Sequence, residues 1–302
     1  MRYALLFSGQ GTQHPQMLPW LDGAAAAQPL LARLAQSLGA EWRALLRADP
    51  CRTSNALAQP LIVGTATAAW AALRPLLPQA PEVVAGYSVG EVAAFAAAGV
   101  YEPQQAITLA HKRAGLMDAA VQGSDTGLLA ISSVTVADVV STCPGLECAI
   151  RIDPDNNIFG GDRAALGAAQ SALQDRAHFK RICVALASHT SWMRSAALGF
   201  QPVVDATGLQ APECPVALNA TGATSRNPRV LGSALATQLR SCVEWGACMT
   251  AIAERKPDCV IEVGGGNALA RMWAARFPGI PARSLDEFRP LQGAAAWILG
   301  HG

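Results

Sequence analysis

Charged residues are scarce in this sequence. They make up 15% of its 302 residues, and their signs nearly cancel, with 23 Lys and Arg against 22 Asp and Glu. Proteins that bind nucleic acids carry a clear basic excess or a basic stripe, so this balance argues against a nucleic-acid partner. Hydrophobic residues make up 51% of the chain. A chain of this composition buries enough apolar surface to fold, which excludes disorder as a description of the whole.

Long apolar runs are also missing. No uninterrupted stretch approaches the roughly 20 residues that a membrane-spanning helix requires. The apolar segment Tyr3–Phe7, which follows Arg2, is too short for the hydrophobic region of a signal peptide. We therefore expect a cytoplasmic protein that makes no contact with a membrane.

The cysteines form neither a CxxC pair nor a zinc-finger-like spacing with histidine. In a chain of this length without a signal peptide, such cysteines are expected to be reduced and mostly packed in the core, and no metal site is expected. The eight cysteines are Cys51, Cys143, Cys148, Cys183, Cys214, Cys242, Cys248 and Cys259.

Several short apolar runs are each followed by a turn and a helical stretch. This repetition predicts an α/β fold with a parallel sheet covered by helices. The predicted strands are Tyr3–Phe7, Val83–Ala85, Val216–Leu218 and Val260–Val263. The predicted helices, rich in alanine and leucine, are Gln59–Leu77, Val89–Ala98, Pro103–Val121 and Val230–Cys242.

The middle of the chain has a different pattern, in the order β-α-β-β-α-β. This order is typical of a ferredoxin-like arrangement. Its predicted strands are Thr126–Ser132, Cys148–Ile152, Asn157–Gly160 and Phe179–Leu186, and its predicted helices are Val136–Ser141 and Arg163–Arg176. We expect an inserted α+β subdomain over residues 126–186, inside a larger domain formed by residues 1–125 and 187–302.

The segment Gly86–Gly90 fits the pattern G-x-S-x-G between a predicted strand and a predicted helix. A tight strand-to-helix turn needs small residues beside the serine, and it presents Ser88 at a helix N-terminus, where a developing oxyanion is stabilised. A plain strand–helix turn in a glycine-rich chain gives the same pattern. Glu91 favours the nucleophile because it can brace the first turn of the helix.

A nucleophilic serine needs a base, and His189 is the best-placed histidine. It follows the apolar segment Cys183–Leu186, and strand ends are where α/β enzymes gather catalytic groups. A packed core histidine is the alternative. The remaining histidines, in a loop, a helix, a basic segment and the C-terminal tail, are His14, His111, His178 and His301.

Seven sequence blocks occur in order between residue 3 and about residue 285. They are Phe7–Gln13, Gln59-Pro60, Gly86–Glu91, Arg113 with Met117, Ser188-His189, Gln238-Leu239 with Val243 and Trp245, and Glu262–Gly266. In these blocks the chain resembles the malonyl-CoA:acyl-carrier-protein transacylase family, whose blocks read FPGQGSQ, GHSLGE, a later arginine, SH and EVGPG. The resemblance implies a hydrolase-like α/β core with an inserted ferredoxin-like subdomain. It also implies an acyltransferase that uses malonyl-CoA as substrate and holds no permanent cofactor.

The resemblance also implies roles for individual residues. Ser88 matches the nucleophile that accepts the acyl group, and His189 matches its general base. Gln238 matches the residue whose main-chain carbonyl orients the imidazole in place of a triad carboxylate. The main-chain N–H groups matching Gln10 and Val89 form the oxyanion hole in the family.

Arg113 matches the arginine that receives the free carboxylate of the malonyl group. A planar guanidinium binds a carboxylate through two parallel hydrogen bonds, which suits this role. Without the resemblance, its position beside His111 and Lys112 would indicate a surface charge. Further substrate-binding residues implied by the resemblance are Gln59, Met117 and Ser188.

The chain departs from the family pattern at three positions: Tyr87 replaces a histidine, and Ser8 and Gly265 replace prolines. The block Gly-Tyr-Ser-Val-Gly-Glu resembles the ε subunit of malonate decarboxylase. That subunit charges a dedicated carrier subunit, which bears a phosphoribosyl-dephospho-CoA arm. An acyl-carrier protein, and this carrier subunit in particular, is therefore the expected partner. A housekeeping transacylase of fatty-acid or polyketide synthesis is the alternative.

Two other classes of function remain open. An esterase would need an acidic triad member between the serine and the histidine, and the acids in that interval, Asp153, Asp155 and Asp162, fall in the inserted subdomain. A non-catalytic subunit that docks a carrier would not need Ser88 and His189.

The densest basic cluster comprises Arg176, Lys180 and Arg181. It is either a solvated face or a landing patch for the carrier.

Overall fold

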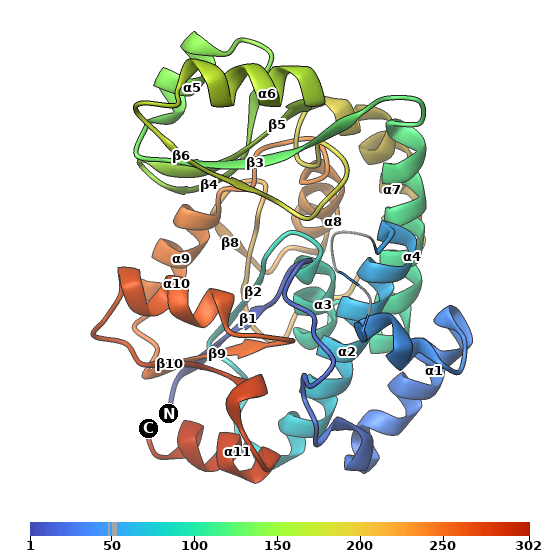
Figure 1. Cartoon of the computed structure of the whole chain (residues 1–302). Helices are drawn as coiled ribbons and strands as arrows, with labels where there is room; N and C mark the ends of the chain where they lie inside the picture. The colour runs from blue at the N-terminus through green and yellow to red at the C-terminus, as the bar shows by residue number, and fades with distance from the viewer. Residues whose placement is uncertain (48, 50–52) are drawn as a thin grey trace.

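The computed structural model describes residues 1–47, 49 and 53–302, which form two β-sheets with helices packed around them (Figure 1). The larger sheet has the strand order β10-β9-β1-β2-β7-β8. Its strands are β1 (Tyr3–Phe7), β2 (Val83–Gly86), β7 (Val216–Ala217), β8 (Thr224–Ser225), β9 (Cys259–Val263) and β10 (Ala282–Ser284). All neighbours pair in parallel except β8, which pairs antiparallel to β7 at one edge. The predicted parallel sheet is confirmed.

Strand β1 lies inside the larger sheet and is buried on both faces. Its register places Leu5 opposite Val84 on one side and Ile261 on the other. Successive side chains alternate between two apolar clusters, with Phe7 in one and Leu6 in the other. A strand covered on both faces is apolar throughout, which explains the unbroken apolar run that the sequence shows here.

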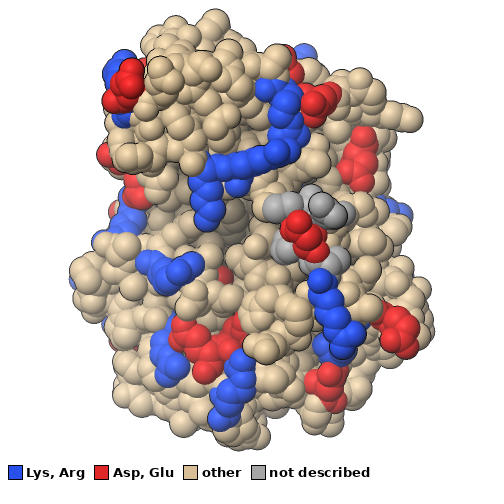
Figure 2. All heavy atoms as spheres, in the orientation of Figure 1, with Lys and Arg blue, Asp and Glu red and all other residues tan. Residues whose placement is uncertain are grey.

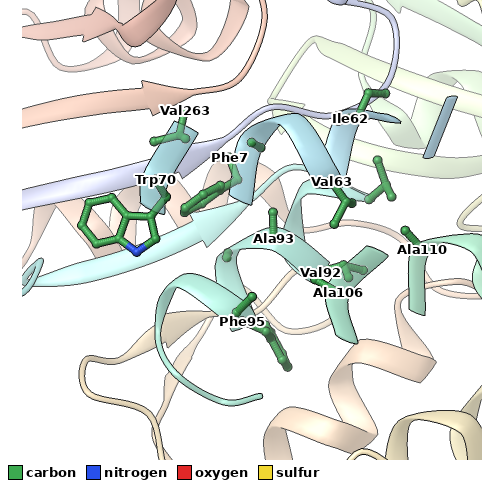
Figure 3. Close-up of a cluster of buried hydrophobic side chains, with 14 of the residues drawn as sticks. Phe7, Ile62, Val63, Trp70, Val92, Ala93, Phe95, Ala106, Ala110 and Val263 are labelled. Atoms are coloured by element: carbon green, nitrogen blue, oxygen red, sulfur yellow. The ribbon is translucent and has the colours of Figure 1, made fainter. Parts of the chain in front are cut away.

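Helices cover both faces of the larger sheet. One cluster contains residues of α2, α3, α4, α7, α8 and α11, and Figure 3 shows Phe7 beside Trp70 of α2. The other cluster contains residues of α9 and α10. The helices of this part are α1 (Gln28–Leu38), α2 (Asn55–Leu73), α3 (Gly90–Ala97), α4 (Pro103–Ala120), α7 (Arg194–Asp205), α8 (Pro228–Thr237), α9 (Trp245–Ala253), α10 (Ala268–Arg276) and α11 (Leu291–Leu299).

Helix α2 and the short 3-10 turn after it, residues 55–76, are long and apolar enough to cross a membrane by length and composition. In the fold, 83% of that apolar window is buried by the rest of the protein. A helix that is hydrophobic all round is expected in the core of a large protein, and α2 is such a core helix.

The smaller sheet has the order β4-β5-β3-β6, with antiparallel neighbours throughout. Its elements are β3 (Thr126–Ser132), α5 (Val136–Thr142), β4 (Glu147–Asp153), β5 (Asn156–Asp162), α6 (Arg163–Ala172) and β6 (His178–Arg181). The β-α-β-β-α-β order confirms the ferredoxin-like arrangement. Residues 126–186 remain our prediction for the extent of the subdomain.

The smaller sheet packs α5 and α6 on one face and the core on the other. Leu129 and Phe159 belong to the cluster under these two helices, whereas Leu128 and Ile158 join the cluster that includes α9 and α10. In Figure 1, the two helices lie above the small sheet and the larger sheet lies below it. Side chains of the two sheets meet in that shared cluster.

Four predicted elements end four or five residues earlier than expected. The last strand of the small sheet ends at Arg181 instead of Leu186, because the chain then leaves β3 and Val184 packs against both core clusters. Helix α6 ends at Ala172 instead of Arg176. Helix α8 ends at Thr237 instead of Cys242, because Val243 forms a parallel bridge with Ile150 of β4. Helix α2 runs from Asn55 to Leu73 instead of from Gln59 to Leu77. The other predicted boundaries shift by smaller amounts.

The cysteine prediction is wrong at one position, since Cys183 is disulfide-bonded. Folding decides which thiols meet, and sequence spacing does not reveal it. The free cysteines are Cys143, Cys148, Cys214, Cys242, Cys248 and Cys259. Cys51 lies outside the described residues.

Candidate active site

The segment Gly86–Gly90 forms a sharp turn between β2 and α3. Ser88 at its tip has a φ of 55°, a conformation that side-chain-bearing residues rarely adopt. The positions of the flanking glycines leave no room for a side chain. A Cβ atom on Gly86 would lie 2.1 Å from the carbonyl carbon of Gly90, and one on Gly90 would lie 2.3 Å from the carbonyl oxygen of Phe7. This is the geometry of a strained nucleophile turn.

Asn219 holds this turn from the end of the neighbouring strand β7. Its Oδ1 accepts the main-chain N–H of Ser88 at 2.9 Å, and its Nδ2 donates to the carbonyl of Gly86 at 2.7 Å. The sequence analysis missed Asn219. The available signal was its position, because polar residues at the carboxyl ends of parallel strands gather at one edge of the sheet.

His189 meets Ser88 from the loop that follows the small sheet. Its Nε2 lies 2.7 Å from Ser88 Oγ, and its Nδ1 lies 2.6 Å from the main-chain oxygen of Gln238. A carbonyl only accepts hydrogen bonds, so Nδ1 carries the proton and Nε2 is free to accept one from Ser88. His189 also has a positive φ, 63°, and its N–H donates to the carbonyl of Leu239 at 2.8 Å.

The surroundings keep the imidazole neutral. The pKa of His189 is lowered to about 3, chiefly by burial and also by the positive charge of Arg113, while the hydrogen bond to the Gln238 carbonyl opposes both effects. At neutral pH the ring is therefore in the form that accepts a proton.

The other histidines and the three aspartates of the esterase alternative lie elsewhere. His14 pairs with Asp286 at 2.6 Å, and His111, His178 and His301 are exposed. Asp153 pairs with Arg276, and Asp162 caps α6. Nδ1 of His189 faces a carbonyl where an esterase triad has a carboxylate, which disfavours that alternative.

Two main-chain N–H groups lie in the pocket of Ser88. Val89 is the N-cap of α3. Gln10 follows β1, the strand that pairs with β2. Both residues line the same pocket as Ser88, and neither N–H has a hydrogen-bond partner among residues 1–47, 49 and 53–302. Such a pair is suited to bind the oxygen of a tetrahedral intermediate.

The guanidinium of Arg113 is buried in α4, with the residue 1% exposed. Its Nη1 donates to Gln59 Oε1 at 2.7 Å, and its Nη2 donates to Gln238 Oε1 at 2.9 Å, while its Nε has no partner. Burial lowers the pKa of Arg113 to about 10, and the charge of Glu91 opposes this effect. Arg113 is therefore charged at neutral pH, but within the described chain it contacts amides and no carboxylate.

The pocket above Ser88 brings together eight of the nine predicted site residues. They are Gln10, Gln59, Ser88, Val89, Arg113, Met117, Ser188 and His189. The ninth, Gln238, is fully buried behind His189 and Arg113. Apolar residues of the small sheet complete the lining: Leu128, Ile150 and Ile158. The pocket thus lies between the two sheets and combines a serine hydroxyl, a neutral imidazole, two main-chain N–H groups and a cation.

Tyr87, which replaces the histidine of the family pattern, belongs to the packing of the pocket wall. Its ring meets Trp245 edge-on at 5.1 Å between centroids. Burial raises the pKa of Tyr87, so its hydroxyl stays neutral. The serine that replaces a family proline has a structural partner, since Ser8 Oγ donates to Glu262 at 2.8 Å.

A second hollow, of about 240 Å³, adjoins the pocket and shares Gln10 and Tyr87 with it. Lys180 and Arg181 of β6 line this hollow. Figure 2 shows a shaded recess between the two parts of the molecule, with Lys and Arg side chains along its upper rim. Arg176, the third member of the predicted basic cluster, lies in the turn after α6 and does not line the hollow.

The sequence matches the acyl transferase domain family over residues 4–274. It is 30% identical over 301 residues to the malonyl CoA-acyl carrier protein transacylase of Mycobacterium tuberculosis H37Rv, with 93% of this chain and 95% of that protein covered. The structure is similar to FabD from Acinetobacter baumannii, with a TM-score of 0.90 and 25% identity over 100% of this chain and 99% of that one. It is also similar to an acyl-carrier-protein S-malonyltransferase from Burkholderia pseudomallei 1710b, with a TM-score of 0.89 and 26% identity over 98% of this chain and 100% of that one.

Proposed function

The chain belongs to the acyl transferase domain family and is an acyltransferase, and from this premise we propose that it moves a malonyl group from malonyl-CoA to the thiol of an acyl-carrier protein. The observation that carries the proposal is Arg113. A buried cation without a carboxylate partner is unfavourable, and an anionic substrate that supplies one resolves the cost. The free carboxylate of a malonyl group is such a partner.

In the first half-reaction, Ser88 Oγ attacks the thioester carbonyl of malonyl-CoA while its proton passes to Nε2 of His189. The carbonyl oxygen takes the negative charge and accepts hydrogen bonds from the N–H groups of Gln10 and Val89. The C–S bond then breaks, and the CoA sulfur leaves with the proton from the imidazolium. The product is a malonyl ester on Ser88.

In the second half-reaction, the carrier thiol gives its proton to His189 and its sulfur attacks the ester carbonyl. The C–O bond to Ser88 breaks, and the serine oxygen recovers the proton. The substrate assists this cycle. Its carboxylate neutralises Arg113, whose charge lowers the pKa of His189, so the bound malonyl group makes the imidazole a stronger base.

For the carrier, we propose the dedicated subunit of malonate decarboxylase, with its phosphoribosyl-dephospho-CoA arm. The block Gly-Tyr-Ser-Val-Gly-Glu supports this assignment, because Tyr87 stands where the housekeeping transacylases have histidine. Tyr87 lines both the pocket and the adjoining hollow, so it borders the route of a carrier arm. Transfer to a phosphopantetheine carrier of fatty-acid or polyketide synthesis is the alternative.

The catalytic proposal also separates this chain from a non-catalytic docking subunit. Such a subunit would have no need for a hydrogen bond between Ser88 and His189, or for an imidazole oriented by a carbonyl. We further propose that the protein works in the cytoplasm without a permanently bound cofactor. In keeping with this location, the long apolar helix α2 is a core helix.

A transfer assay with two carriers tests the proposal. Purified enzyme and malonyl-CoA are mixed with a carrier that bears ordinary phosphopantetheine or with one that bears the extended arm, and malonyl-carrier is measured by mass. We expect transfer to the extended arm at a higher kcat/KM. Preference for phosphopantetheine would favour the housekeeping alternative, and transfer to neither carrier would overturn the proposal.

A further inference from the structure

Glu91 lies beneath the site and takes no part in the steps above. It follows the nucleophile turn in the first turn of α3, and it is fully buried. Its two carboxylate oxygens face different parts of the site. Oε1 accepts the main-chain N–H of Asn219 at 2.7 Å, and Oε2 accepts Nε2 of Gln238 at 2.8 Å. One buried carboxylate therefore contacts the residue that holds the nucleophile turn and the residue that orients the base.

The two ends of the Gln238 side-chain amide face different partners: hydrogen-bond acceptors surround its Nε2, and a donor faces its Oε1. Its Nε2 also donates to the carbonyl of Ser88 at 2.9 Å, and its Oε1 accepts from Nη2 of Arg113 at 2.9 Å. A carboxylate and a carbonyl only accept, and a guanidinium only donates. If the amide turned over, its NH₂ would meet Arg113 and its oxygen would meet Glu91, and both contacts would repel.

We propose that Glu91 is a positioning residue that fixes the amide orientation of Gln238, and that through this amide it holds Arg113 ready for the substrate carboxylate. The proposal rests on the role proposed above for Arg113. A glutamine at position 91 has one oxygen for two donors, the N–H of Asn219 and Nε2 of Gln238, so one of these donors would face an NH₂ group. The contact that holds the Gln238 amide against the guanidinium would then be weakened. Substrate selectivity would then depend on a residue that never touches the substrate.

The charge of Glu91 gives this arrangement a pH dependence. Burial raises the pKa of Glu91 to about 7, opposed by the hydrogen bonds from Asn219 and Gln238 and by the charge of Arg113. Below that pH a proton occupies one carboxylate oxygen, and an acceptor on which Gln238 or Asn219 depends is lost. Malonyl selectivity is therefore expected to rise as the pH increases through about 7.

The other titratable groups near Glu91 do not change charge in this range. Burial raises the pKa of Tyr101 and of Cys248, so both stay protonated. His189 stays neutral because its pKa is about 3, and Arg113 stays charged because its pKa is about 10. An acid limb in the pH profile, that is, a fall in malonyl selectivity below about pH 7, therefore reports the protonation of Glu91.

The test replaces Glu91 by an amide of the same shape, Glu91→Gln, and measures kcat/KM for malonyl-CoA and acetyl-CoA from about pH 5 to about pH 9, on either side of the pKa of Glu91. We expect the malonyl-to-acetyl ratio at pH 8 to fall about tenfold or more, as for a lost charge-assisted hydrogen bond. The acid limb near pH 7, present in the wild type, should be absent from the variant. An unchanged ratio with an unchanged limb would overturn the proposal.

Glu262→Gln is the matched control. Glu262 is the second buried glutamate whose pKa burial raises to about 7, and it accepts hydrogen bonds from Ser8 and from the N–H of Ala270 in α10. Its variant should keep both the selectivity ratio and the acid limb. If the fall in selectivity below about pH 7 were lost in Glu262→Gln, it would come from Glu262 and not from Glu91.

A second variant keeps the proposal testable if Glu91→Gln does not fold. Gln238→Ala removes the amide but leaves the main-chain carbonyl that orients His189, so it should lose selectivity to the same degree. Where both fold, the double variant should lose no more than either single variant, because both act through one contact. Additive losses would contradict the proposal. Failure of the proposed function is a separate outcome, since the wild type itself would then show no preference for malonyl-CoA.

Discussion

At the scale of single residues, the site depends on two strained backbones. Ser88 and His189 both have positive φ, and in each case a main-chain N–H is held by a partner from another segment: Asn219 for the serine and Leu239 for the histidine. Residues held in sparsely populated conformations persist only when their surroundings specify them. The hydrogen bond between Ser88 and His189 is therefore imposed by the packing around it.

Arg113→Ala should change substrate choice more than nucleophile strength. Without the guanidinium, the malonyl carboxylate is left unpaired in a buried pocket, a loss of about 2–4 kcal/mol in transition-state stabilisation. Removing the positive charge also raises the pKa of His189, so acetyl transfer should be kept or increased. Steady-state kcat/KM for both donors measures this.

Lys112→Ala, an exposed neighbour on α4, is the control and should leave both donors unaffected. If Arg113→Ala lost malonyl and acetyl transfer equally, Arg113 would support the fold instead of binding the substrate.

At the scale of secondary-structure elements, the strand–turn–helix unit of β2 and α3 packs the turn around Ser88 against β1. The close approach of Gly90 to the carbonyl of Phe7 fixes this packing. A methyl group at this position must displace the backbone of the strand next to it, and a closely packed core does not accommodate such a displacement without strain.

Gly90→Ala should therefore lower the free energy of unfolding by about 1–3 kcal/mol or more and slow acylation of Ser88. Gly115→Ala on α4 is a matched control, because a Cβ there meets nothing within 4 Å. It should raise stability by about 0.5–1 kcal/mol, as alanine does in a helix interior. Urea unfolding of both variants measures the difference, and equal stability would refute the packing argument.

The local elements were largely predictable, and contacts between distant segments were not. The strand at Tyr3–Phe7 and the turn around Ser88 follow from an unbroken apolar run and from glycines at fixed positions. The predicted end of the last small-sheet strand at Leu186 was wrong. Val184 packs against both core clusters, and these contacts with distant segments cannot be read from the order of the sequence. Asn219 was missed for a similar reason: its role depends on β7 lying beside β2.

At the scale of the whole molecule, the site lies between two subdomains and draws its walls from both. The core supplies Ser88, His189 and Arg113, and the small sheet supplies apolar cover and the basic rim formed by Lys180 and Arg181. With a net charge of only +1, the protein has no strong overall field. A local basic rim is therefore the feature that can steer an acidic partner toward the hollow.

Reversing both charges of the rim, with Lys180→Glu and Arg181→Glu, should slow transfer to the carrier and flatten its salt dependence. Acylation by malonyl-CoA should be unchanged if the rim serves the carrier. Arg229→Glu with Lys256→Glu alters the net charge equally at exposed positions outside the hollow, and it should retain wild-type carrier kinetics. Equal carrier kinetics of both double variants at low salt would show that the carrier docks on another surface.

The central claim is that Ser88 carries the malonyl group between donor and acceptor. It is tested most directly by the masses of the intact protein and of its proteolytic peptides after mixing with malonyl-CoA in the absence of a carrier. The account predicts an adduct of about 86 Da, the mass of a malonyl ester, on the peptide that contains Ser88, its removal on addition of the carrier, and no adduct on Ser88→Ala. An adduct that persists in Ser88→Ala, or transfer to the carrier without any acylated enzyme, would contradict it.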